Sequence, residues 1–119
     1  MRVVVLLVLF GWGSLSSNAW SLDAKQWFVE GNQFSSEGKF EEAARAYQKS
    51  IDQNPMAPVA HYNLGIAYKN LRQLDKAAVV LEKAVELAPS NLDIRLTLGN
   101  IYNMQERWKD AIGQLNIVV

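Results

Sequence analysis

The feature that most constrains this chain is a repeat with a period of 34 residues. Glycines stand at Gly31, Gly65 and Gly99, and an aromatic residue follows three positions later in every copy. The same step relates other positions that hold residues of one kind: Ala43, Ala77 and Ala111; Phe40, Leu74 and Trp108; Tyr47, Leu81 and Leu115; Pro55 and Pro89. A short unit that recurs at a fixed interval is typical of repeat proteins, in which neighbouring units stack and share one elongated core.

Each repeat divides into two segments of helical length. Apolar residues recur at helical spacing, as at Ala77, Leu81 and Val85, with polar residues on the opposite face. Short turns separate the two segments at 37–39, 71–73 and 105–107. The pattern predicts an all-α chain, a solenoid of antiparallel helix pairs, with repeats at 24–57, 58–91 and 92–119, the third being incomplete.

Prolines, polar caps and glycines indicate how these helices end and meet. Pro55 and Pro89 should end the second helix of their repeats, and Pro58 can occupy the first turn of the next helix. Ser90 or Asn91 should cap the first helix of the third repeat. A glycine inside a helix costs about 1 kcal/mol relative to alanine, so three at one position indicate close helix contact. We expect these glycines to face the repeated alanines: Gly31 with Ala43, Gly65 with Ala77 and Gly99 with Ala111.

The pattern resembles the tetratricopeptide repeat family, whose signature is Trp-x2-Leu-Gly-x2-Tyr, then Ala-x3-Phe, then Pro. The three copies read Trp27-x2-Glu30-Gly31-x2-Phe34, Ala43-x3-Tyr47 and Pro55; His61-x2-Leu64-Gly65-x2-Tyr68, Ala77-x3-Leu81 and Pro89; Arg95-x2-Leu98-Gly99-x2-Tyr102 and Ala111-x3-Leu115. The departures are Glu30, where the family favours an apolar residue, and His61 and Arg95, where it favours Trp. Glu30 indicates that the first repeat is a solvated end. The resemblance implies a right-handed superhelix that binds peptides on its concave face.

The first 19 residues have the layout of an export signal. Arg2 precedes the apolar run Val3 to Phe10, and Ser17-Asn18-Ala19 predicts cleavage after Ala19, with a short leader at 20–23. The apolar stretch is interrupted and falls short of the roughly 20 residues that a bilayer span needs. We therefore expect an exported protein, periplasmic or secreted, with a bacterial periplasm favoured and no membrane span in the mature chain. An uncleaved anchor is the alternative.

The charge balance and the small number of residues suited to catalysis or metal binding argue against several functions. Twelve basic residues balance twelve acidic ones, so no net charge attracts nucleic acid, and the absence of cysteine excludes a disulfide, a thiolate metal site and a cysteine nucleophile. His61, the only histidine, occupies a packing position, and Glu41 and Glu42 begin a helix, where carboxylates favour the positive end of the dipole. Trp27 and Trp108 lie on the apolar helix faces that are expected to form the core. We expect no catalytic residue, no metal, no cofactor and no enzymatic activity.

The family resemblance implies that the first helix of each repeat lines the binding groove. Asparagine amides would bond a peptide backbone, and apolar residues would seat its side chains. The groove residues expected on this basis are Phe28, Asn32, Ser35, Tyr62, Asn63, Ile66, Lys69, Asn70, Asp93, Leu96, Asn100 and Asn103.

One subgroup of the family grips the acidic carboxyl-terminal peptide of heat-shock chaperones with two asparagines and three basic residues. Its asparagines match Asn32 and Asn63 here. Its basic residues would fall on Phe28, Asp93 and Thr97, none of which is positively charged. Because a charge-assisted grip on carboxylates is missing, we expect a neutral or apolar peptide segment instead.

Three functions stay open from the sequence. The first is an exported adaptor that holds a peptide of a partner protein and helps to assemble an envelope complex. The second is a regulatory or targeting front of a longer enzyme, and the third is self-association. The last helix ends in an apolar edge that indicates either continuation beyond Val119 or docking on another chain: Ile112, Leu115, Ile117, Val118 and Val119.

Overall fold

A computed structural model describes residues 22–118 of the chain, with side chains described as far as residue 116. Six helices and no strand occur in that range. The helices are α2 (Ala24–Ser36), α3 (Phe40–Gln53), α4 (Pro58–Asn70), α5 (Leu74–Leu87), α6 (Leu92–Met104) and α7 (Trp108–Val118). The all-α prediction is confirmed, and the helix breaks fall at the expected turns. The export signal predicted at the amino terminus lies outside the described residues.

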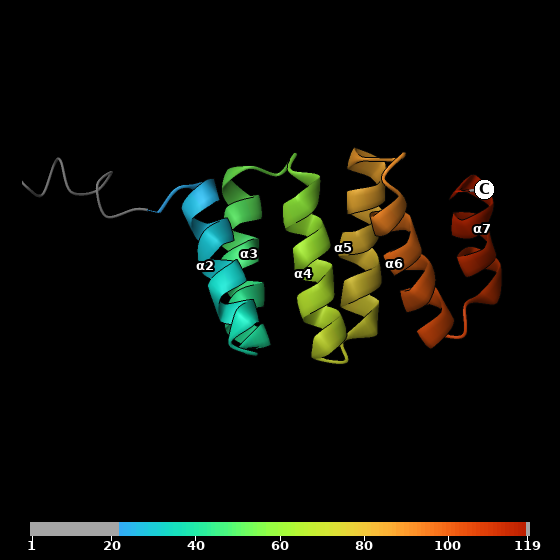
Figure 1. Cartoon of the computed structure of the whole chain (residues 1–119), viewed down its shortest axis with the longest axis horizontal. Coiled ribbons are helices and arrows are strands. Elements are labelled where there is room, and N and C mark those ends of the chain that lie inside the picture. Colours follow the sequence, from blue (N-terminus) through green and yellow to red (C-terminus); the bar gives the residue numbers. More distant parts are fainter. Residues whose placement is uncertain (1–21, 119) are drawn as a thin grey trace, which may run out of the picture.

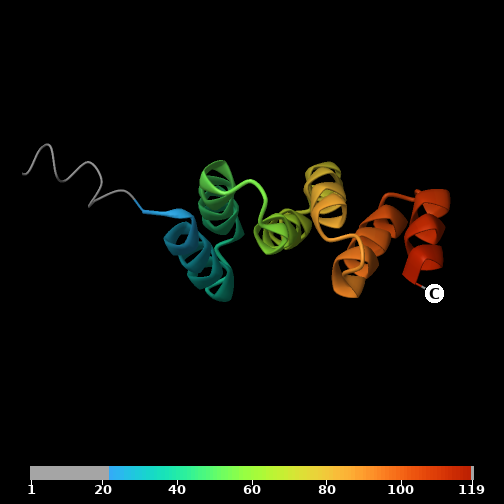
Figure 2. The same ribbon diagram turned by 90° about the horizontal axis from the view of Figure 1, so that it is seen from above.

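The helices stack in chain order, each packing against the next (Figure 1). Viewed from above, α2, α4 and α6 lie along one side of the stack, and α3 and α5 lie along the other (Figure 2). Two buried clusters form the core: α3 with α4, around Tyr47, Ile51 and Leu64, and α5 with α6 and α7, around Leu81 and Leu98. Each helix pair therefore buries its apolar face against a neighbouring pair, as a solenoid requires.

The turn inside each repeat has the same backbone geometry. In the first repeat Gly38 takes a φ of 75°, and the Lys39 N–H donates to the Phe34 carbonyl oxygen at 2.9 Å. This is a Schellman motif, which ends a helix with one residue in the left-handed region. The equivalent residues of the other repeats are Arg72, with a φ of 62°, and Glu106, with a φ of 60°. A left-handed conformation costs a non-glycine residue about 1–2 kcal/mol, so two of the three turns carry strain that the first avoids.

The expected helix ends are confirmed. The Asn91 side chain caps α6 by accepting a hydrogen bond from the Ile94 N–H at 3.1 Å, and Pro58 is the first residue of α4. Pro55 and Pro89 each lie two residues beyond the end of a second helix. Because proline cannot continue a helix, both prolines lie within the link to the next repeat.

Two of the three repeated glycines lie nearest to residues other than those expected, and Gly99 lies nearest to Ala111 as predicted. A Cβ atom built on Gly31 would lie 2.6 Å from two ring carbons of Tyr47, and one built on Gly65 would lie 2.6 Å from Leu81 Cγ. The pairing of these two glycines with the repeated alanines is therefore wrong. Tyr47 and Leu81 lie one helical turn beyond those alanines, and their longer side chains reach across to the first helix. A Cβ at Gly99 would meet nothing nearer than 3.8 Å, where the Ala111 carbonyl oxygen lies.

His61 and Arg95 occupy equivalent positions and make equivalent contacts. His61 Nε2 lies 2.9 Å from the Pro55 carbonyl oxygen, and Arg95 Nε donates to the carbonyl oxygen of Pro89. Both side chains are buried, with 7% and 8% of the residue exposed. Each ties the first turn of its helix to the proline-containing link before it, which confirms a structural role for His61.

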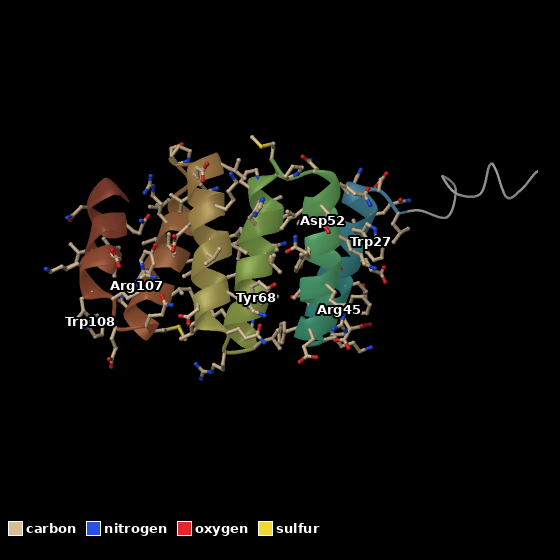
Figure 3. All side chains as sticks on the ribbon, turned by 180° about the vertical axis from the view of Figure 1, so that it is seen from behind. Trp27, Arg45, Asp52, Tyr68, Arg107 and Trp108 are labelled. Carbon is tan, nitrogen blue, oxygen red and sulfur yellow. The ribbon has the colours of Figure 1, made fainter. Side chains whose placement is uncertain are left out.

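The two tryptophans expected in the core differ in environment. Trp27 is half-buried, and Lys49 Nζ lies 4.2 Å from its ring centroid. Trp108 is 57% exposed, so the prediction that it packs in the core is wrong. Figure 3 shows the two residues at opposite ends of the stack. Trp108 begins α7, and no further described helix lies against the outer face of α7 to bury it.

Candidate functional site

An open hollow of about 300 Å³ lies where α2, α3 and α4 meet. We refer to it as the α2–α4 hollow, and its lining residues are Asn32, Ser35, Ser36, Tyr47, Asn63 and Ile66. Four of the twelve expected groove residues are thus brought together: Asn32, Ser35, Asn63 and Ile66. Its size matches the lower end of the range for ligand sites, and its openness suits a segment of extended chain better than an enclosed small molecule.

A hydrogen-bond network organises the floor of the α2–α4 hollow. The Tyr47 hydroxyl donates to Asn32 Oδ1 at 2.7 Å, and Asn63 Nδ2 donates to the same oxygen at 3.1 Å. The three residues come from α3, α2 and α4, so the network joins the first repeat to the second. Two donors on one amide oxygen fix the orientation of the Asn32 side chain.

The phenol of Tyr47 holds its proton in this setting. Burial raises the pKa of Tyr47 above its ordinary value of 10.0, and the neighbouring polar side chains of Ser35 and Asn63 partly oppose that rise. Tyr47 is therefore a neutral hydrogen-bond donor at any physiological pH. The orientation of Asn32 does not depend on pH over that range.

The network leaves both N–H donors of Asn32 Nδ2 and the acceptor Asn63 Oδ1 available. Among the described residues, neither Asn32 Nδ2 nor Asn63 Oδ1 has a hydrogen-bond partner. The C=O of a peptide unit accepts one hydrogen bond, and its N–H donates one. The two amides therefore offer the pair of groups that a single backbone unit of an extended peptide needs.

Phe28 and Tyr62, the expected aromatic anchors, are half-buried and also pack within the protein. The Phe28 ring lies 5.8 Å from that of Tyr47, tilted by 50°, and so supports the residue that orients Asn32. Tyr62 packs against the cluster formed by α5, α6 and α7, and its hydroxyl lies 3.4 Å from Thr97 Oγ1. Neither residue lines the α2–α4 hollow.

The remaining expected groove residues also lie outside the hollow. Asn70 is exposed, and its Nδ2 donates to the Ile66 carbonyl oxygen of the same helix at 3.0 Å. Lys69 is half-buried, and Leu96 is 38% exposed. Three polar residues of α6 are exposed: Asp93, Asn100 and Asn103. Their assignment to a peptide groove stays a prediction.

The sequence analysis did not anticipate Tyr47 or Ser36 in this site. Tyr47 occupies the position that the repeat signature reserves for packing, and 2% of the residue is exposed. Its hydroxyl nevertheless reaches the hollow. The signal in the sequence was the hydroxyl itself, because the equivalent positions hold Leu81 and Leu115, which cannot donate a hydrogen bond.

The α2–α4 hollow carries no charged lining residue. A larger hollow of about 420 Å³, elsewhere on the stack, is lined by charged and polar residues of α3 together with Tyr68 and Leu71. Two of its lining residues, Arg45 and Tyr68, are labelled in Figure 3. Over residues 22–118 no three His, Asp or Glu side chains are grouped closely enough to hold a metal ion. In the same range no helix combines the length and the apolar character that crossing a membrane needs.

Comparison with protein families and curated proteins gives matches to repeat proteins. A family model described as TPR repeat matches residues 31–71, and one described as Tetratricopeptide repeat matches residues 58–91. A TPR repeat-containing protein of Methanocaldococcus jannaschii is 27% identical over 78 residues, which cover 66% of this chain and 14% of that protein. Sperm-associated antigen 1 of Mus musculus is 31% identical over 90 residues, or 76% of this chain and 10% of that protein. The chain thus spans a small part of these relatives.

Solved structures of similar architecture include peptide complexes. The second TPR of Spaghetti (RPAP3), bound to the HSP90 peptide SRMEEVD, superposes with a TM-score of 0.76 at 22% identity, covering 80% of this chain and 88% of that one. The first TPR of Spaghetti, bound to the same peptide, gives 0.76 at 26% identity, covering 80% and 75%. MamA gives 0.78 at 22% identity, covering 81% and 56%.

Proposed function

Since this chain belongs to the tetratricopeptide repeat family, we propose that it is an interaction scaffold that holds an extended peptide segment of a partner protein in the α2–α4 hollow. The single observation that carries the proposal is the pair of amide groups left available by the network, Asn32 Nδ2 and Asn63 Oδ1. A donor and an acceptor held by three helices favour recognition of a peptide backbone. The preorganised geometry reduces the entropy lost on binding.

The partner segment that suits this hollow is neutral or apolar. The two Spaghetti domains were solved with SRMEEVD, a peptide that carries three acidic side chains. No charged residue lines the hollow here, and the positions where basic residues would stand hold Phe28, Asp93 and Thr97. An acidic peptide would lose water from its carboxylates without gaining a cationic partner. Ile66 supplies an apolar surface for one side chain of a neutral segment.

The place of action in this proposal comes from the sequence. The export signal predicted at residues 1–19 supports work outside the cytoplasm, most simply in a bacterial periplasm. A small scaffold in that compartment would help to assemble or position a complex of the cell envelope. Its contribution would be to bring a partner segment into place rather than to catalyse a reaction.

Capture of partners from the native envelope fraction tests the proposal. The protein is immobilised and exposed to the solubilised fraction, and retained proteins are identified and mapped to peptides. Asn32→Ala should reduce the affinity for the retained partner about 5- to 160-fold, since an anchor of this kind contributes about 1–3 kcal/mol. Tyr62→Ala tests whether the site extends beyond the hollow, because Tyr62 lies outside it. Reduced retention would indicate a wider groove, and unchanged retention would indicate a site confined to the hollow.

Gln33→Ala is the matched control, because it removes an exposed amide from the same helix, α2, at a residue that lines neither hollow. Its retention should equal that of the unmodified chain. Equal retention by Asn32→Ala and the control, with unchanged helix content, would contradict the proposed site. A synthetic SRMEEVD peptide should bind no better than a scrambled neutral peptide.

A further inference from the structure

The junction of α3 with α4 carries the larger hollow of about 420 Å³, which shares no lining residue with the α2–α4 hollow. We refer to it as the α3–α4 hollow, and Arg45 and Tyr68 line it from neighbouring helices (Figure 3). Its lining includes Glu41, Arg45 and Gln48 from α3, Tyr68 from α4, and Leu71 and Gln73 from the turn after α4. The three α3 residues lie at positions i, i+4 and i+7, so they share one helical face.

An equivalent junction occurs one repeat later, where α5 meets α6, and there the chain bridges it with its own side chains. The residues 34 positions after Glu41, Tyr68, Leu71 and Gln73 are Asp75, Tyr102, Gln105 and Arg107. Gln105 Nε2 donates to Asp75 Oδ1 at 2.7 Å, and Arg107 Nη1 donates to Gln105 Oε1 at 3.4 Å. The Arg107 guanidinium lies 4.3 Å from the centroid of the Tyr102 ring, within the range of a cation–π contact. A guanidinium on a tyrosine ring, linked through an amide to a carboxylate, therefore fills this junction.

The first junction lacks both bridging side chains. Leu71 stands in the place of the bridging glutamine and has no polar group that could reach Glu41. Gln73 stands in the place of the arginine, and it is shorter and uncharged. Among the described residues, neither the Glu41 carboxylate nor the Gln73 amide takes part in a side-chain hydrogen bond or ion pair. The carboxylate and the tyrosine ring are thus present at this junction without the group that joins them at the next.

The charges around the α3–α4 hollow favour a cation as its occupant. The basic lining residue, Arg45, has a partner on its own helix, because its Nη2 lies 3.9 Å from Glu42 Oε1. Lys76 Nζ lies 5.7 Å from the centroid of the Tyr68 ring, and Lys76 does not line the hollow. Glu41 is therefore the lining charge that has no partner in the part of the chain that the structure describes.

We propose that the α3–α4 hollow binds an arginine side chain of a partner protein. Its guanidinium would donate to the Glu41 carboxylate and stack on the Tyr68 ring, in the place that Arg107 fills at the second junction. The exposed amide oxygens of Gln48 and Gln73 can accept its remaining N–H groups. Arginine suits this site better than lysine, because a planar guanidinium can stack on a ring and bond a carboxylate at the same time.

Nuclear magnetic resonance titration of the ¹⁵N-labelled full chain with N-acetyl-arginine amide tests this site. The side-chain amide signals of Gln48 and Gln73 should shift to saturation. Those of Asn32 and Asn63 should stay in place, because these residues line the other hollow. N-acetyl-citrulline amide has the same shape without the charge, so it should bind at least about fivefold more weakly.

Four variants separate the contributions to this binding. Glu41→Gln should weaken it about 2- to 5-fold, because the charge is lost and the shape is kept. Glu30→Gln is the matched control, since it removes an exposed carboxylate that lines neither hollow, and it should leave the affinity unchanged. Arg45→Gln should strengthen the binding, because it removes a like charge from the lining. The double variant Leu71→Gln with Gln73→Arg gives the first junction the bridge of the second and should abolish the shifts.

Three results would overturn the inference. The first is a titration without saturating shifts at Gln48 and Gln73, and the second is equal affinity for the arginine and citrulline probes. The third is equal affinity of the Glu41→Gln and Glu30→Gln variants with unchanged helix content. Because no peptide for the α2–α4 hollow is present, each of these results would leave the proposed peptide site unaffected.

Discussion

Gly65→Ala and Gly99→Ala change the same repeat position in opposite packing environments. A Cβ at residue 65 would lie 2.6 Å from Leu81 Cγ and 2.8 Å from its Cδ2, whereas at residue 99 the nearest atoms are at 3.8 and 3.9 Å. Leu81 is 0% exposed, so its side chain cannot swing into solvent to make room. The same substitution should therefore destabilise one repeat and stabilise the other.

The magnitudes follow from two opposing effects. Replacing a helical glycine by alanine gains about 1 kcal/mol of helix propensity in either variant. Overpacking a filled interface costs about 1–3 kcal/mol, and here the clash is with the branch point of a buried leucine. Gly65→Ala should thus lower the free energy of unfolding by up to about 2 kcal/mol, and Gly99→Ala should raise it by about 0.5–1 kcal/mol. Gly65→Leu should unfold the stack.

Urea unfolding followed by circular dichroism measures the free energy of unfolding of both variants, and thermal unfolding measures their melting temperatures. The melting temperatures should differ by about 4–24 °C, since the variants differ by about 1–3 kcal/mol and about 1 kcal/mol shifts the midpoint of a domain of this size by about 4–8 °C. Gly31→Ala should behave like Gly65→Ala, because its Cβ would meet the rigid ring of Tyr47 at 2.6 Å. Equal shifts for the variants at residues 65 and 99 would refute the argument that packing against the second helix explains the glycine.

Three further perturbations test the turns, the core and the site. Arg72→Gly should stabilise the chain by about 0.5–1 kcal/mol in urea, because it relieves a left-handed residue, and Gly38→Ala should act in the opposite direction. Burial raises the pKa of Tyr102 from 10.0 to about 12, so its contribution to stability is complete below pH 10 and is lost as pH rises towards 12. Tyr102→Phe should therefore reduce the loss of stability in alkaline urea titrations, and an identical loss would contradict this. Tyr47→Phe removes the 2.7 Å hydrogen bond to Asn32, which should cost about 0.5–1.5 kcal/mol and lower partner capture with helix content unchanged.

The sequence by itself determined the repeat, the helix pairs and their ends. These features depend on local chemistry: proline cannot continue a helix, and Asn91 can cap one with its own side chain. Glu30 indicated a solvated first repeat, and the exposed polar face of α2 agrees with it. Three of the hollow's six lining residues lie in α2, one lies in α3 and two lie in α4. The local sequence pattern did not indicate that residues of these three helices would line one hollow.

Only the tertiary structure decided which side chains meet across the repeats. Periodicity gives residues equivalent positions, but contact distance depends on side-chain length and on how closely each helix pair approaches. For this reason Gly31 and Gly65 face Tyr47 and Leu81 rather than the repeated alanines, whereas Gly99 lies nearest to Ala111 as expected. Trp108 is likewise exposed where its equivalents are half-buried. The Tyr47 hydroxyl likewise reaches Asn32 across 15 positions of sequence, a contact that exists only once α2, α3 and α4 have packed together.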